Sequence, residues 1–527
     1  MRHIHFILFF FFFLTVSAQE EVMLGGKVLL AEDITGEYIE ADSFSLEKPA
    51  YDMRVSDDDK TAVIRYRSIT KKNKWAKGAW LQLINLTTMK PRWEKAFDNA
   101  DFEYDISKHG IIVNYGDKMC MMDREMPVKL WEIAMKPVYW SDSLDIVLGY
   151  PSFYSSKVCA YRLSTGEKLW EIKVSHDMMW GWNDVIVIDN TNLLVLADDL
   201  CFIDLTTGEL KKLKAKTGIT DTKSIILQGL LSFGAAMAGA ALTGGAYVPA
   251  TYGIGPNVIS GLASNILQED TLYYVSDREN LRCIDRHFNL VWNYELPSKQ
   301  ASSADLFMAD SLLYMVNYGF GLRGGGAGQV KCGRPFIASF DPKTGACHTF
   351  NRLTTKKDII ISALRVEDEA YLLFDDGMAL QQLNDSVVNM SPWDVAQYGR
   401  IQMALPDTLF ARHDGERVLR PIAFDGLSCP VLSYHSATKK AAVFIVDREL
   451  KVVDQFPYEQ LYFPHAHYNN YYLVTGQGGD CWVVSQYGLP SSHVNLSRVK
   501  GFAACKDYLY MLRQDCLLRV ENKSIFR

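Results

Sequence analysis

The sequence predicts an all-β fold built from a repeated four-stranded unit, and three observations support this prediction. An apolar strand, a tight polar turn, a second strand and an aromatic residue recur along the 527-residue chain. The tryptophans that end three successive copies, Trp93, Trp131 and Trp170, lie 38 and 39 residues apart. No helical periodicity competes with the strand pattern outside one insert. A period of about 40 residues is that of one propeller blade, so we expect a β-propeller of four-stranded blades.

The turn and the aromatic residue of each copy have physical reasons. In the best copy, residues 159–172, the turn Ser164-Thr165-Gly166 precedes Trp170. Glycine suits a turn position that needs positive φ. The aromatic side chain buries ~150–250 Å², or roughly 4–6 kcal/mol as an upper bound at ~25 cal/mol/Å². The structural repeat residues predicted in this way are Trp93, Trp131, Trp170, Gly166, Gly208, Trp292 and Gly345.

The number of blades is less directly encoded than the fold. About ten turn-centred units can be counted, whereas propellers usually have four to eight blades, and we expect eight. Either some units are extra hairpins, or the N-terminal strands within residues 28–44 close the ring. The predicted organisation is a signal peptide at 1–18, N-terminal strands at 19–57 and a propeller at 58–527 with an insert at 224–268.

The first residues have the layout of a secretory signal peptide. Arg2 precedes a short apolar run from Phe6 to Val16, and small residues lead to a cleavage site between Ala18 and Gln19. The apolar run is shorter than the ~20 residues of a membrane span. We therefore expect an exported protein that is periplasmic or associated with the cell envelope.

One insert, residues 224–268, interrupts the repeat and contains no charged residue or histidine. Gly234 and Ala238 have the spacing of small residues that lets a helix approach another closely. Two interpretations are open. The insert folds as an apolar hairpin against the propeller face, or it contacts a membrane or the groove of a partner, since so apolar a patch is rarely left exposed.

The repeat units resemble the pyrroloquinoline-quinone-type repeat, roughly Asp-x-x-Thr-Gly-x-x-x-Trp, from about Asp58 to the C-terminus. That family includes quinoprotein alcohol dehydrogenases and a cofactor-free propeller lipoprotein of outer-membrane-protein assembly. The resemblance implies aromatic residues wedged between neighbouring blades. The quinoproteins carry an adjacent pair of cysteines and a calcium site. Here no two cysteines are adjacent and no spacing singles out a set of oxygen ligands, so the chain is closer to the assembly branch.

The ten cysteines of the chain do not all point to disulfides. Cys120, Cys159 and Cys201 occupy the same place in three successive repeats, which indicates small buried packing positions. Pairing of Cys332 with Cys347, and of Cys505 with Cys516, is open, because spacing alone cannot show it.

A few residues outside the repeat are candidates for binding. His465 and His467 lie two apart, so on one strand both rings can reach one metal, but no third ligand is visible. Trp180 and Trp182 are candidate contacts for a carbohydrate or small ligand. Gly325, in the glycine-rich run 324–328, marks a loop that is a candidate contact on the propeller rim.

Composition and motifs together favour a binding protein over an enzyme. The net charge of −7 argues against nucleic acid as a partner, because phosphate recognition needs a clustered basic surface. No catalytic constellation is visible, and no cofactor is predicted. We expect a non-enzymatic macromolecular binding or assembly scaffold whose partner is a protein or another envelope component. Two alternatives remain: a degenerate quinoprotein oxidoreductase that binds pyrroloquinoline quinone with calcium, and a propeller that binds carbohydrate or a small ligand.

Overall fold

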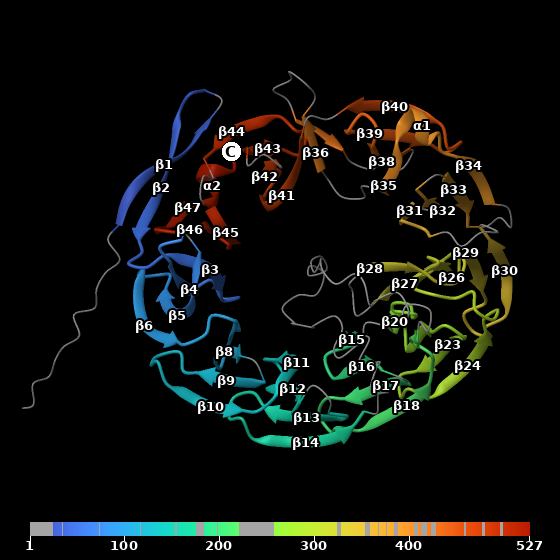
Figure 1. Cartoon of the computed structure of the whole chain (residues 1–527), viewed down its shortest axis with the longest axis horizontal. Helices are drawn as coiled ribbons and strands as arrows, with labels where there is room; N and C mark the ends of the chain where they lie inside the picture. The colour runs from blue at the N-terminus through green and yellow to red at the C-terminus, as the bar shows by residue number, and fades with distance from the viewer. Residues whose placement is uncertain are drawn as a thin grey trace, which may run out of the picture.

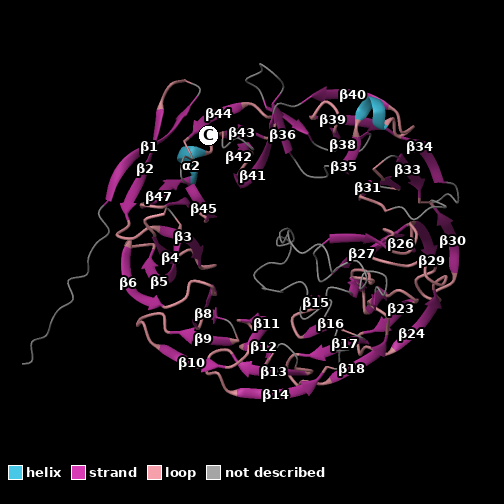
Figure 2. Ribbon diagram, viewed as in Figure 1, coloured by secondary structure: helices cyan, strands magenta, loops and turns pink. Residues whose placement is uncertain are grey.

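The computed structural model describes the greater part of the chain. The described residues are 25–33, 35–72, 74–115, 117–152, 155–174, 184–197, 199–220, 258–323, 328–353, 359–366, 368–375, 377–383, 388–404, 409–412, 419–422, 428–457, 460–476, 480–495 and 499–527. Almost all of the regular structure among them is antiparallel β-sheet, and the two short helices, α1 (Val395–Tyr398) and α2 (Asn522–Ile525), stand out in Figure 2.

The strands form blades of four, which are numbered here along the chain. Blade 1 is β3 (Ala50–Val55), β4 (Thr61–Ile69), β5 (Trp75–Asn85) and β6 (Lys90–Phe97); blade 2 is β7 (Glu103–Ser107), β8 (Gly110–Tyr115), β9 (Lys118–Met122) and β10 (Lys129–Ile133); blade 3 is β11 (Lys136–Ser141), β12 (Ile146–Tyr150), β13 (Lys157–Arg162) and β14 (Lys168–Lys173). Blade 4 is β15 (Asp184–Val187), β16 (Asn192–Leu196), β17 (Asp199–Asp204) and β18 (Leu210–Lys214); blade 5 is β21 (Leu267–Glu269), β22 (Leu272–Ser276), β23 (Asn280–Asp285) and β24 (Leu290–Glu295).

The second half of the chain continues the same plan. Blade 6 is β25 (Ala304–Ala309), β26 (Leu312–Asn317), β29 (Phe336–Phe340) and β30 (Cys347–Arg352); blade 7 is β31 (Ser362–Val366), β32 (Glu369–Leu373), β33 (Gly377–Gln382) and β34 (Val388–Pro392); blade 8 is β35 (Arg400–Ala404), β38 (Ser428–His435), β39 (Lys440–Asp447) and β40 (Val452–Pro457). Blade 9 is β41 (Gln460–Tyr468), β42 (Tyr471–Gly476), β43 (Cys481–Ser485) and β44 (Pro490–Val494); blade 10 is β45 (Val499–Ala504), β46 (Tyr508–Arg513), β47 (Cys516–Glu521) and β2 (Tyr38–Ser45).

The blades stand side by side in a ring, with β3 and β11 on the inner side and β6, β10 and β14 on the outside (Figure 1). This confirms the predicted all-β propeller of four-stranded blades. The prediction of eight blades is not confirmed, because the described strands form ten such groups, two of them joined within one eleven-stranded sheet. The count of about ten turn-centred units in the sequence agrees with this number.

The core of the molecule lies between blades rather than at one centre. In the described part of the chain, each of the ten junctions between neighbouring blades holds its own cluster of buried apolar side chains. At the junction of blades 10 and 1, for example, Leu512 and Leu517 pack with Ile64 and Ile84. The ring is therefore continuous: no junction lacks an apolar contact.

The N-terminal strands join the two ends of the chain. β1 (Gly25–Asp33) pairs with β44 of blade 9 through residues 31–33, and also with β2. β2 in turn pairs with β47 as the outer strand of blade 10, so the β1–β2 hairpin spans blades 9 and 10. Arg519 of β47 forms an ion pair with Asp42 of β2 at 2.9 Å.

Two elements lie outside the ten blades. The hairpin of β36 (Leu409–Arg412) and β37 (Leu419–Ile422) pairs with β41 of blade 9. A separate four-stranded sheet, called here the inner sheet, consists of β19 (Ile219–Thr220), β20 (Val258–Ser260), β27 (Phe320–Arg323) and β28 (Gly328–Lys331). Figure 1 shows its strands β20, β27 and β28 on the inner side of the ring. Within the described residues, no helix is both long and apolar enough to cross a membrane.

Candidate functional site

The repeat residues predicted from the sequence meet at the blade junctions. Trp170 of blade 3 donates a hydrogen bond from Nε1 to the carbonyl oxygen of Leu205 in blade 4 at 3.1 Å. Its ring lies against Gly208, where φ is +75° and a Cβ atom would come within 2.8 Å of the indole. The same arrangement holds Trp131 against Leu163 and Gly166, and Trp292 against Pro342 and Gly345. Trp93 is buried at the junction of blades 1 and 2.

The inner sheet brings together two segments that the sequence marked separately. β19 and β20 flank residues 221–257, which make up most of the predicted insert 224–268, and β27 and β28 flank the glycine-rich residues 324–327. Pairing of β20 with β27 places both hairpins in one sheet. Residues 221–257 and 324–327, with Gly325, lie outside the described residues.

Close packing holds the two hairpins of the inner sheet together. Gly321 of β27 is needed at its position, because a Cβ atom there would lie 2.5 Å from Cγ2 of Ile259. The hydroxyl of Ser260 donates to the carbonyl oxygen of Leu322 at 3.1 Å. Ile259, Leu262 and Cys332 form the small apolar cluster of the sheet.

Other predicted contact residues are not tested by the structure. Trp180 and Trp182 lie outside the described residues, as do Ala18 and Gln19 of the predicted signal cleavage site.

The two histidines proposed as weak metal candidates contact different aromatic rings. His465 stacks on Phe502 of blade 10 with ring centroids 5.1 Å apart, and His467 stacks on Tyr472 with centroids 6.1 Å apart. The strand has a β-bulge between Pro464 and Ala466, which interrupts the alternation that would put both histidines on one face. Among the described residues, no group of three potential ligands surrounds them or any other position.

All ten cysteines lie in the described part of the chain, and each is a free thiol. Burial raises the pKa of Cys120 and Cys283 to about 11 and that of Cys429 to about 12. Since the thiolate is the reactive form, these groups are poor nucleophiles at neutral pH. These three thiols therefore lie in buried packing positions.

A cavity of about 130 Å³, called here the inner cavity, lies where the inner strands of blades 1, 2 and 3 adjoin. Its lining residues are Asp52, Arg54, Arg65, Glu103, Tyr104, Asp105, Ile112, Asn114, Pro137 and Trp140. Because β3, β4, β7, β8 and β11 all contribute, the cavity depends on three blades at once. None of these residues belongs to a turn motif, so the sequence prediction missed them. The available signal was the alternation of charged residues in a strand, at Glu103 and Asp105.

One wall of the inner cavity is a closed network of charges. Arg65 forms an ion pair with Asp52 and also donates from Nη1 to the carbonyl oxygen of Phe102 at 2.6 Å. The hydroxyl of Tyr104 donates to Asp52 at 2.8 Å. Burial and the neighbouring Asp52 carboxylate raise the pKa of Tyr104 well above its ordinary value, so the phenol stays protonated.

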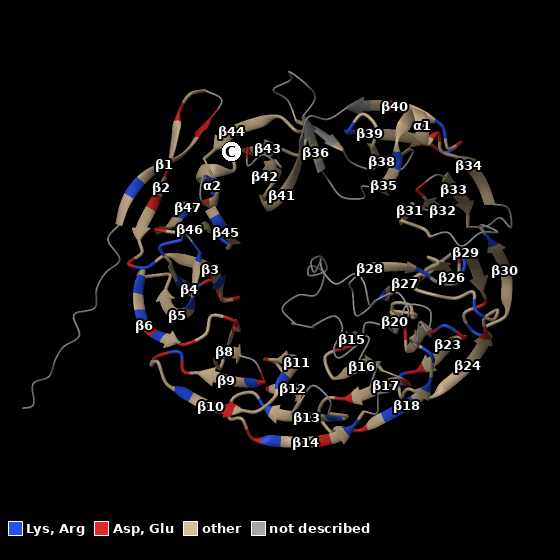
Figure 3. Cartoon of the chain, in the orientation of Figure 1, with Lys and Arg blue, Asp and Glu red and all other residues tan. Residues whose placement is uncertain are grey.

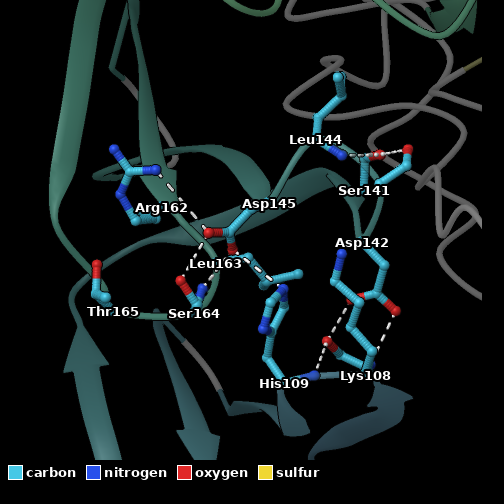
Figure 4. A network of polar contacts seen from close by, with 12 residues as sticks. Lys108, His109, Ser141, Asp142, Leu144, Asp145, Arg162, Leu163, Ser164 and Thr165 are labelled. Carbon is cyan, nitrogen blue, oxygen red and sulfur yellow. Dashed lines mark hydrogen bonds and ion pairs between the residues drawn. The ribbon is translucent and has the colours of Figure 1, made fainter.

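A second network fixes the end of β7 against blade 3 (Figure 4). Asp142 accepts hydrogen bonds from the hydroxyl of Ser107 and from the backbone N–H of Lys108, the latter at 2.9 Å. Asp145, with φ of +54°, accepts from the backbone and the hydroxyl of Ser164, both at 2.7 Å. This turn therefore ties blade 2 to blade 3 beside the inner cavity and positions its lining strands.

Charges of both signs are interspersed along the outer strands of the ring (Figure 3). In β10 and β14 they pair within the blade, Lys129 with Glu132 and Lys168 with Glu171. These pairs are exposed, so each contributes little to stability.

No family model and no curated protein matches the chain. Similar solved structures include BamB from Moraxella catarrhalis, with 10% identity over 76% of this chain and 97% of that chain and a TM-score of 0.32. A europium-containing methanol dehydrogenase has 11% identity, 76% and 84% coverage and a TM-score of 0.29. The dihydro-heme d1 dehydrogenase NirN in complex with DHE has 8% identity, 82% and 78% coverage and a TM-score of 0.32. Values this low imply nothing about what this chain binds.

Proposed function

We propose that the chain is an exported, non-enzymatic β-propeller that serves as a binding or assembly scaffold for a protein or other component of the cell envelope. The supporting observation is the inner sheet, which is additional to the ten blades and joins the apolar insert to the glycine-rich hairpin. A closed ring of blades needs no such sheet for its own core, since its ten junctions are already filled. An added element that gathers two unusual segments is better explained by binding.

The export part of the proposal rests on the N-terminal sequence, and the assembly part on the repeat, which resembles that of the cofactor-free assembly propeller. The quinoprotein alternative is not adopted, because the residues do not fit. The sequence has no adjacent cysteines. Within the described residues no cluster of His, Cys, Asp and Glu has the make-up of a metal site. We therefore assign no reaction step to a quinone.

Site-specific photo-crosslinking in the exporting cell tests this proposal. A photoreactive residue at the exposed Gln329 of β28 should give a discrete adduct, whereas the same residue at the exposed Asn293 of blade 5 should not. Replacing residues 224–255 with a short Gly-Ser linker, which leaves β19 and β20 in place, should abolish the adduct and release the protein from membrane fractions. Intact mass of the mature protein should correspond to a chain that begins at Gln19.

Two controls separate lost binding from lost folding. Gly321→Val should disrupt the inner sheet and the adduct, because its side chain meets Ile259 and Leu262, while Gly26→Val has nothing within 4 Å and should change neither. Replacing residues 413–418 in the β36–β37 hairpin should also leave the adduct intact. If the linker variant still forms the adduct and stays with the membrane, the insert is not the working surface and the scaffold proposal is wrong.

A further inference from the structure

The inner cavity is not used by the proposed scaffold function, and several hydrogen-bond acceptors line it. At about 130 Å³ it has room for several groups of the size of water, whose share of liquid volume is about 30 Å³. It lies at blades 1 to 3, whereas the inner sheet joins a segment between blades 4 and 5 to a hairpin inserted within blade 6. A ligand of the inner cavity would therefore occupy a different site from the partner of the inner sheet.

The side-chain amide of Asn114 is the group in the cavity that most directly indicates a ligand. Its Oδ1 atom is buried and receives no hydrogen bond in the described part of the chain. An unsatisfied buried acceptor is costly, about 1–3 kcal/mol, and such groups are uncommon in folded proteins. In the register of β7 and β8, Asn114 is directly opposite Glu103, so the two side chains lie on the same face of blade 2.

Asp105 adds a second acceptor on that face, two residues along β7 from Glu103 and opposite Ile112. Among the described residues, the one hydrogen bond to its carboxylate is from the backbone N–H of Ile106, at 2.8 Å. Burial raises the pKa of Asp105; Asp57 and Asp142 act in the same direction, and Arg54 acts against it. A neighbouring cation would relieve this destabilised carboxylate.

The basic residues of the cavity do not supply the missing donors. The guanidinium of Arg65 is committed to Asp52 and to backbone carbonyls at the opposite wall. Arg54 also lines the cavity, but it is exposed and forms no ion pair within the described structure, and it acts on Asp105 only through its charge. The Oδ1 atom of Asn114 and the carboxylates of Asp105 and Glu103 are thus three acceptors among the residues that line the cavity.

The remaining walls suit a short hydrocarbon chain that ends in a cation. Ile112 and Pro137 are apolar and Trp140 is partly exposed. An aromatic face attracts an ammonium group by about 0.5–2 kcal/mol, depending on its solvation. The exposed Arg54 disfavours a second positive charge on the same ligand.

We propose that the inner cavity binds a single primary ammonium group carried on an unbranched alkyl chain, with the N–H donors directed to Asn114, Asp105 and Glu103. Two sources share this chemistry, a lysine side chain of a protein and a free alkylamine.

Titration calorimetry of the full mature protein tests the site. The probes are the blocked peptide acetyl-Gly-Gly-Lys-Gly-Gly-amide, its norleucine analogue, which has a neutral chain of similar length, and n-pentylamine. The lysine peptide or n-pentylamine should bind saturably and the norleucine peptide should not. Tighter binding of the peptide identifies a protein-borne lysine, and tighter binding of n-pentylamine identifies a free amine. The indole NMR signal of Trp140, assigned with Trp140→Phe, should shift on titration.

Near-isosteric variants connect binding to the named groups. Asp105→Asn, which can still accept from Ile106, should weaken binding by about 10- to 100-fold, as expected for loss of a charge-assisted hydrogen bond. Glu103 is exposed, so Glu103→Gln should weaken amine binding less than Asp105→Asn does. Glu295→Gln, on the outer strand of blade 5, should leave amine binding unchanged. No binding of either amine, equal binding of the norleucine peptide, or full affinity in Asp105→Asn would each overturn the proposal. None of these outcomes depends on the inner sheet, so this proposal can fail while the scaffold function stands.

Discussion

Trp170 joins blades 3 and 4 through one hydrogen bond and through packing of its ring against a glycine. Its indole donates to Leu205, and its ring occupies the space that a Cβ atom on Gly208 would need. Glycine is required at position 208 for two reasons: the indole leaves no room for a Cβ atom, and the backbone there has a φ of +75°. The repeat motif contains both a turn glycine and a tryptophan, but the tryptophan of one repeat packs against the glycine of the next.

Replacing Trp170 with alanine removes this contact and leaves a cavity at the junction of blades 3 and 4. We expect the free energy of unfolding to fall by about 3–5 kcal/mol, as for other large-to-small substitutions in cores. Urea unfolding followed by circular dichroism measures it. Tyr487→Ala is the matched control, because that aromatic side chain is 70% exposed and its loss should cost within ~0.5 kcal/mol. A loss below ~1 kcal/mol for Trp170→Ala would contradict the inter-blade role.

At the scale of the element, the turns are the part of this fold that a sequence predicts best. Asp204 accepts from the backbone N–H groups of Thr206 and Thr207 at 2.8 and 2.9 Å. Asp341 accepts in the same way from the two residues that precede Gly345. All these partners lie within three residues, so the pattern is visible in a short stretch of sequence.

The same turns predict how stability depends on pH. Burial alone would raise the pKa of Asp204 and Asp285, but hydrogen bonds from their own turns hold both pKa values below the usual range. Hydrogen bonds from Thr344 lower the pKa of Asp341. A carboxyl whose pKa is lower in the folded than in the unfolded chain stabilises the fold above the unfolded value of about 3.9. That stabilisation is lost as pH falls through the lowered folded values.

We therefore expect the thermal unfolding midpoint to fall as pH is lowered from about 5 to 2, and to fall less in the triple variant Asp204→Asn, Asp285→Asn, Asp341→Asn. Asparagine still accepts the turn hydrogen bonds but does not titrate. The difference between parent and variant in the slope of unfolding midpoint against pH therefore measures the contribution of the three carboxylates. Differential scanning calorimetry at a series of pH values measures it. The variant Asp310→Asn, in the turn between β25 and β26, serves as control. Equal slopes in the triple variant and the parent would show that other groups dominate acid unfolding.

Elements built from distant segments could not be predicted in this way. The inner sheet pairs Ile259 with Arg323, more than sixty residues apart, through strands of two to four residues that carry no periodic signal. The inner cavity likewise needs Asp52, Asp105 and Trp140 from three successive blades. Each of these residues looks ordinary in its own strand. Their proximity is a property of the ring.

At the scale of the whole molecule, the number of blades follows from closure rather than from counting motifs. Ten junctions are each filled by an apolar cluster, and the last blade is completed by β2 from the other end of the chain. The sequence could indicate about ten units, but the degenerate turns of the later copies obscured which of them form full blades. Pairing of β2 with β47 spans more than 470 residues, a distance over which no local pattern carries information.

Removing the β1–β2 hairpin, residues 25–45, should open the ring. The deletion takes away the buried side chains of Leu30, Ile39 and Phe44, each worth roughly 1.5–3 kcal/mol, and uncovers the edges of β44 and β47. Exposed strand edges pair with other chains. We therefore expect a lower urea midpoint and self-association on size-exclusion chromatography with light scattering. The point variant Lys27→Ala, exposed on β1, should match the parent in both measurements. A truncated chain that stays monomeric at an unchanged midpoint would show that blades 9 and 10 hold together without the N-terminal hairpin.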